Sequence, residues 1–150
     1  MKSVLTRAAV ASAAVALTAT TFATAPAGAA VTQDSSSAAT TYYGAIALNT
    51  RTLAVGTSVN ARYRSSAQSA ALKRCKQYSY SSYCKNVVWV SNGCAAVAVK
   101  YDSKGRPVRY GSAYGKSKWP TVRLAKKRAM GTSTAGTVKT RAYLCTTRYY

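Results

Sequence analysis

Four cysteines have the widest chemical repertoire in this 150-residue sequence, because a cysteine can hold a metal, act as a nucleophile or form a disulfide. They are Cys75, Cys84, Cys94 and Cys145. A zinc site made of four thiolates has pairs of ligands a few residues apart. Here eight, nine and fifty residues lie between successive cysteines. We therefore expect no zinc site, and the rest of the chain decides between reactive thiols and disulfides.

Catalytic chemistry lacks its usual residues. The sequence has no histidine and no glutamate, and its two acids are Asp34 and Asp102. Catalytic triads, Cys-His dyads and paired carboxylates all need groups that exchange protons near neutral pH. A Ser-Lys dyad or a tyrosine acid stays open, but no spacing singles one out. We expect no enzyme and no cofactor, and we expect no metal because His and carboxylate ligands are missing.

The N-terminal residues are typical of a cleaved secretory signal peptide. Lys2 and Arg7 precede an apolar run at 8–17, and small residues follow as far as 27–29. This run is shorter than the ~20 residues that span a bilayer. We therefore predict an extracellular protein, released or associated with the cell wall, with no transmembrane segment after cleavage. The predicted organisation is a signal peptide at 1–29, a disordered lead-in at 30–41 and a single domain at 42–150.

In a small exported domain, an even number of cysteines is typical of disulfides. An Asn-Gly pair at 92–93 between two apolar runs predicts a type I′ hairpin. In that hairpin Cys84 would lie on the order of 20 Å from Cys94, too far for a bond. Two arrangements remain. We favour Cys75 with Cys84, which closes a short loop, and Cys94 with Cys145, which ties the hairpin to the last strand.

The elements that would position these cysteines follow the same order in both halves of the domain. They are two strands within 43–60, a helix at 65–78, a strand at 85–90, a hairpin at 94–115, a helix at 119–131 and a strand at 137–147. Residues 56–60 align with 111–115 at an offset of 55. We predict an α+β fold in which a tandem β-β-α-β repeat forms one antiparallel sheet, with two helices packed on one face and disulfides as staples.

Both predicted helices have end signals and a stripe of small side chains. Ser65 is the expected N-cap of the first helix, while Pro120 and Gly131 mark the first turn and the end of the second. Small residues allow a helix to approach a sheet closely. Those on the inner faces are Ala67, Ala70 and Ala71 in the first helix, and Val122, Ala125 and Ala129 in the second.

The combined pattern resembles the domain-of-unknown-function family 4189, a family of small secreted bacterial domains. The residues that carry it are 43–47, an Ala-rich helix ending in Cys75, the pattern C-x-x-V-V-x-x-x-N-x-C-A-A that starts at Cys84, and a strand ending at Cys145. The resemblance covers about residues 42–147 and implies no settled activity and no catalytic residues. Similar members usually have six cysteines.

Two of those six cysteine positions are altered in this chain. Met130 stands where a cysteine is expected, and the partner position near Val138 also lacks one. Both halves of one bridge are therefore missing together. The resemblance implies that a bond between Cys75 and Cys84 is the surviving equivalent in the first repeat.

Charge is the strongest compositional signal. The chain has 22 Lys and Arg against two Asp, and removing Lys2 and Arg7 with the leader leaves twenty cations and two acids, a net charge of +18. Such an excess attracts anionic polymers, although it can also serve only to keep a secreted domain soluble. Membrane activity is disfavoured because no strongly amphipathic helix stands alone.

Aromatic rings alternate with many of these cations, an arrangement that suits stacking and anion binding on one surface. We expect the partner to be an anionic cell-wall or extracellular polymer, or alternatively an acidic protein that an inhibitor or effector would dock. Nucleic acid is less well supported because no nucleic-acid-binding signature is present. The predicted contact residues are Arg62, Arg64, Lys73, Arg74, Lys116, Lys118, Trp119, Arg123, Lys126 and Lys127.

Overall fold

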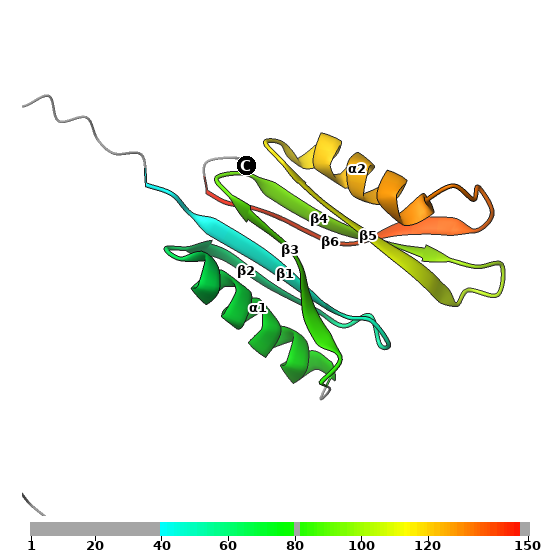
Figure 1. Cartoon of the computed structure of the whole chain (residues 1–150), viewed down its shortest axis with the longest axis horizontal. Helices are drawn as coiled ribbons and strands as arrows, with labels where there is room; N and C mark the ends of the chain where they lie inside the picture. The colour runs from blue at the N-terminus through cyan, green and yellow to red at the C-terminus, as the bar shows by residue number, and fades with distance from the viewer. Residues whose placement is uncertain (1–39, 80–81, 148–150) are drawn as a thin grey trace, which may run out of the picture. The chain divides into compact units, whose positions relative to one another are not determined.

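The computed structural model describes residues 40–79 and 82–147 (Figure 1). The predicted signal peptide and most of the predicted lead-in lie outside these residues. The elements are β1 (Tyr43–Asn49), β2 (Val55–Ala61), α1 (Arg64–Ser79), β3 (Cys84–Ser91), β4 (Cys94–Tyr101), β5 (Pro107–Gly115), α2 (Lys118–Met130) and β6 (Thr137–Cys145). Among the described residues, no helix is long and apolar enough to cross a membrane.

The six strands form two separate antiparallel sheets of three strands each. The first sheet has the order β2-β1-β3 and the second has the order β5-β4-β6. Helix α1 packs on the first sheet and α2 packs on the second, on opposite sides of the paired sheets (Figure 1). The prediction of one sheet built from a tandem repeat, with both helices on one face, is therefore wrong, although the α+β class is consistent with the structure.

The central strands explain why two sheets form. Ile46 and Leu48 of β1 point into a core between the sheets, whereas Ala45 and Ala47 point toward α1. Strand β4 is likewise buried from Cys94 to Lys100, and its small residues Ala96 and Ala98 pack against α2. A strand that is apolar on both faces needs a cover on each. One helix and one opposing sheet supply the two covers.

The connection between β3 and β4 differs from the predicted hairpin. These strands belong to different sheets, so the Asn92-Gly93 pair turns a corner between layers and the hairpin prediction is wrong. The Asn92 side chain accepts a hydrogen bond from the Tyr42 backbone N–H at 2.9 Å. The Gly93 N–H donates to Thr146 Oγ1, and the Thr146 N–H donates to the Gly93 carbonyl, both at 2.9 Å. These long-range bonds fix the corner.

The helices lie very close to their sheets at two glycines. A Cβ atom at Gly56 would collide with the backbone of α1 at Ala71 and Cys75. A Cβ atom at Gly111 would collide in the same way with α2 at Ala129. The small residues predicted for the inner faces are buried in α1 and α2 as expected, apart from the half-buried Ala70.

The predicted helix ends are partly confirmed. Helix α2 contains Pro120 in its first turn and is capped at its C-terminus by Gly131, whose positive φ of 66° suits glycine because it has no side chain. Helix α1 begins at Arg64, so Ser65 lies inside its first turn and is not the N-cap. The Tyr63 carbonyl instead accepts the first helical hydrogen bond, from the Ala67 N–H.

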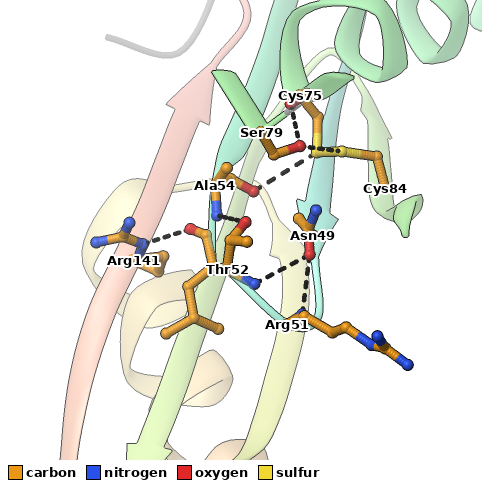
Figure 2. The surroundings of a disulfide bond; sticks show 9 residues. Asn49, Arg51, Thr52, Ala54, Cys75, Ser79, Cys84 and Arg141 are labelled. Carbon is orange, nitrogen blue, oxygen red and sulfur yellow. Dashed lines mark hydrogen bonds between the residues drawn. A yellow bond between two sulfur atoms is a disulfide. The ribbon is translucent and has the colours of Figure 1, made fainter. Parts of the chain in front are cut away.

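Both favoured disulfides are present. Cys94 and Cys145 lie directly opposite each other on β4 and β6, with Cα atoms 4.0 Å apart. Cys75 near the end of α1 bonds Cys84 at the start of β3. Figure 2 shows the Ser79 hydroxyl beside this second disulfide, donating to the Cys75 carbonyl at 2.8 Å. The two disulfides fit a domain that resides in an extracellular or periplasmic compartment.

Candidate functional site

The cations of the described residues have almost no acid with which to pair. Asp102 is the only acidic side chain in residues 40–79 and 82–147, and it lies in the turn between β4 and β5. Its carboxylate accepts the Arg106 backbone N–H at 2.8 Å and forms an ion pair with the Arg106 guanidinium at 2.9 Å. The backbone hydrogen bond is the main reason that the pKa of Asp102 is lowered. The charges of all other described cations must be neutralised by groups outside the described residues, such as solution anions or a bound partner.

One group of cations, the α1 face, lies along the exposed side of α1 and just before its start. Arg64 stacks its guanidinium 3.9 Å from the centre of the Trp89 ring. Arg74 donates to the Thr57 carbonyl of edge strand β2 at 2.6 Å, which occupies one of its five N–H groups. The α1 face consists of Arg62, Arg64, Lys73, Arg74 and Lys76, all exposed.

A second group, the α2 face, lies along α2 and the loop that precedes it. Arg128 donates to the Ser112 carbonyl of edge strand β5 at 2.7 Å, the counterpart of the Arg74 contact in the other sheet. The α2 face consists of Lys116, Lys118, Trp119, Arg123, Lys126, Lys127 and Arg128, all exposed except the half-buried Lys118.

Aromatic rings and a cation form a cluster at the start of α2. The Lys118 ammonium lies 4.0 Å from the centre of the Tyr143 ring and 4.8 Å from the centre of the Trp119 ring. It also donates to the Tyr143 hydroxyl at 2.8 Å. Trp119 is 68% exposed and Tyr143 is 50% exposed, so both rings keep open faces beside a fixed positive charge. This arrangement can stack on flat ligand groups while attracting anionic ones.

The predicted contact residues therefore do not form one surface. Arg62, Arg64, Lys73 and Arg74 lie with α1, whereas the other six lie with α2, and two sheets separate the helices (Figure 1). The fold prediction placed both helices on one sheet face, and the contact residues were predicted residue by residue. Because each helix covers a different sheet, the structure divides these residues into the α1 face and the α2 face.

A cavity of about 560 Å³ lies between the edge strands β3 and β5. Its lining is mainly apolar and includes Val87, Val90 and Ala113, with Lys116 and Arg128 also contributing. The Ser112 hydroxyl bridges the two sheets here by donating to the Val87 carbonyl at 3.0 Å. That carbonyl is available because the β1–β3 register shifts at Val87.

A family model described as "Domain of unknown function (DUF4189)" matches residues 43–148. The chain belongs to the DUF4189 family. This confirms the resemblance seen in the sequence. Neither the curated proteins nor the solved structures contain a match to the chain. The family description assigns no activity, so the function of this DUF4189 domain must be argued from its own surface.

Sequence reasoning missed Tyr143, Arg128 and Lys76. Along β6 of the DUF4189 domain, Lys139, Arg141 and Tyr143 are exposed at alternating positions, which is the period of a strand with one open face. That alternation was the available signal for Tyr143. Arg128 follows Lys127 directly in the sequence, but its contact with Ser112 depends on which strand forms the sheet edge, and no local pattern reveals that.

Proposed function

We propose that this domain is a secreted, non-catalytic module that binds anionic polymers of the cell envelope or extracellular space. The observation that carries the proposal is the absence of acids on the α1 and α2 faces, since the one acid of the described residues is paired with Arg106 in the turn between β4 and β5. A cationic surface without internal counter-ions gains free energy by exchanging its small anions for a polyanion.

Side chains on the α2 face support a polymer rather than a compact ligand. Arg123, Lys126 and Lys127 follow one another along the exposed side of α2, and Lys116 extends the row beyond the helix start. A helix rises 1.5 Å per residue, so residues 116–127 span on the order of 16 Å. A row of that length fits several repeating anionic groups. Phosphate in teichoic-type wall polymers and carboxylate in acidic polysaccharides both have the required charge.

Secretion is part of this proposal. It is supported by the leader-like sequence at 1–29 and by two disulfides, which persist in oxidising compartments. The mass of the protein recovered from culture medium tests it. A mature chain that begins near residue 30 or 31 is expected, whereas recovery of the full-length chain from the cytosol would contradict secretion.

The binding experiment is a pull-down on purified cell walls, with and without their teichoic-type polymers, across a salt series. Retention should decrease as salt rises, because exposed charge contacts are screened over about 8 Å at physiological ionic strength. Retention should also decrease when the polymers are removed. Retention that is indifferent to salt would refute the proposal.

A matched pair of variants separates a specific surface from net charge alone. The α2 variant (R123Q, K126Q, K127Q) removes three cations from the α2 face, and the control variant (R51Q, K104Q, K139Q) removes three exposed cations from elsewhere. The α2 variant should bind walls more weakly than the control variant. Equal weakening would mean that net charge acts without a defined surface and mainly keeps the protein soluble.

An acidic protein is the second candidate partner, and the cavity between β3 and β5 favours it. Its apolar lining beside Lys116 and Arg128 suits a chain that carries both apolar and acidic side chains. Contacts in such a cavity persist in high salt because much of the binding free energy comes from buried apolar area. A stoichiometric complex that survives high salt would favour this candidate over the polymer.

A further inference from the structure

We propose that the domain holds two polyanion chains at the same time, one on the α1 face and one on the α2 face, and so cross-links anionic polymers. This inference rests on the proposed function and adds that binding is bivalent. It follows from the placement of the two helices on opposite sides of the paired sheets (Figure 1).

The distance between the two faces makes them electrostatically independent. Stacked sheets lie about 10 Å apart and each helix axis lies at least about 5 Å outside its sheet, so the axes of α1 and α2 are at least about 20 Å apart. Screening in physiological salt acts over about 8 Å. A chain bound to α1 therefore neither competes with nor repels a chain bound to α2.

The sides of the domain between the two faces are poorer in cations than the helices. On the side of β3 and β5, the cavity lining is mainly apolar, its cations Lys116 and Arg128 belong to the α2 face, and the Lys85 ammonium lies 5.4 Å from the centre of the Tyr110 ring. On the side of β2 and β6, Arg141 donates its Nε–H to the Leu53 carbonyl at 2.8 Å. A polymer that continued from one helix around these sides would gain little binding free energy. A second polymer bound to the opposite helix would gain more.

The two faces should differ in affinity. On the α1 face, Arg64 is stacked on Trp89 and Arg74 is bonded to a strand carbonyl, so their charges are partly engaged. On the α2 face Arg128 is likewise bonded to a strand carbonyl, but four other exposed cations remain, against three on the α1 face, and the open rings of Trp119 and Tyr143 lie beside them. We expect the α2 face to bind a given polyanion more tightly, and two classes of site to appear in a titration.

The first measurement is the stoichiometry of a short inorganic polyphosphate whose extended length is below the separation of about 20 Å between the helices. Calorimetry at about 0.1 M salt, where screening acts over about 10 Å, should give two chains per wild-type domain. The α1 variant (R62Q, K73Q, K76Q) and the α2 variant should each bind one chain, while the control variant should still bind two. One chain per wild-type domain would overturn bivalency while leaving the proposed function intact.

The second measurement is light scattering with long-chain polyphosphate, which reports cross-linking. Wild type and the control variant should scatter strongly near charge equivalence, and the α1 and α2 variants should scatter at least fivefold less at the same protein concentration. Equal loss in all three variants would overturn the inference, because net charge alone would then drive aggregation. Absence of any binding in low salt would overturn the proposed function itself, so the two failures are distinguishable.

Discussion

Removing each disulfide by substituting both of its cysteines tests how the fold is held together. The Cys94–Cys145 bond joins residues 51 apart in the sequence and the Cys75–Cys84 bond joins residues 9 apart. On the loop-entropy relation these bonds stabilise the fold by about 4.1 and about 2.6 kcal/mol at 25 °C. The C94A/C145A variant should therefore be less stable than the C75A/C84A variant by about 1.5 kcal/mol.

Urea unfolding of the purified, oxidised proteins measures this difference. With an m-value of about 2 kcal/mol/M, the midpoint should fall by about 2 M in C94A/C145A and by about 1.3 M in C75A/C84A. Alanine at both positions avoids a lone thiol, and the four sites are all buried, so the truncation is similar in both variants. If C75A/C84A were as destabilised as C94A/C145A, loop closure would not be the dominant effect and the reasoning would be refuted.

Three further predictions concern packing and charge. G111A should lower the free energy of chemical unfolding by at least 3 kcal/mol, because its Cβ would collide with the α2 backbone. G105A should lower it by about 1 kcal/mol, because its Cβ meets nothing within 4 Å and only its left-handed φ is unfavourable. Equal losses would contradict the close packing of α2. The lowered pKa of Asp102 means that its contribution to stability is present above the unfolded pKa of about 3.9 and is lost as pH falls through the lower folded pKa. Thermal melts should therefore show wild type losing stability relative to D102N as pH falls below about 4, and parallel curves would contradict this. Polyanion affinity should stay constant from about pH 5.5 to 8.5 for a sulfated polymer, since the chain has no histidine and no glutamate; a tenfold change in affinity over that range would contradict this.

Local signals in the sequence predicted the strands, the second helix and the Cys75–Cys84 disulfide because each depends on neighbouring residues. Pro120 in the first turn of α2 and the Gly131 stop are examples. The Cys94–Cys145 pairing was also predicted correctly, although the alternative Cys84–Cys94 bond was excluded on a hairpin that the structure does not have. The hairpin prediction at Asn92-Gly93 was wrong because this dipeptide can close a hairpin or turn a corner between two sheets. Which of the two forms depends on the pairing of β3 with β1, which is distant in the sequence. The unbroken apolar runs of β1 and β4 were the overlooked signal, since they are typical of strands covered on both faces.

The candidate site was predicted residue by residue but not as an arrangement. Exposed Lys and Arg on each helix follow from helical periodicity, so Lys73, Arg123 and Lys126 could be assigned to outer faces. Whether the two helices share one side depends on which sheet each covers. That depends on long-range strand pairing, which no local pattern contains.

The salt dependence of polyanion affinity at a single face measures how many cations of that face contact the polymer. In the α1 variant background, the α2 face is the remaining binding surface. Four of its five exposed cations, Lys116, Arg123, Lys126 and Lys127, can contact the chain, while Arg128 is bonded to the Ser112 carbonyl. By analogy with single-stranded nucleic acids, log K should fall with log salt with a slope of about −3, or about 50-fold between 50 and 200 mM.

Adding the α2 substitutions to that background should reduce the slope to about −1, because a single contact remains. Adding the control substitutions should leave it near −3. The measurement is equilibrium binding of long-chain polyphosphate at several salt concentrations. A slope near zero before the α2 substitutions, or the same slope after either set, would contradict electrostatic binding through the helix faces.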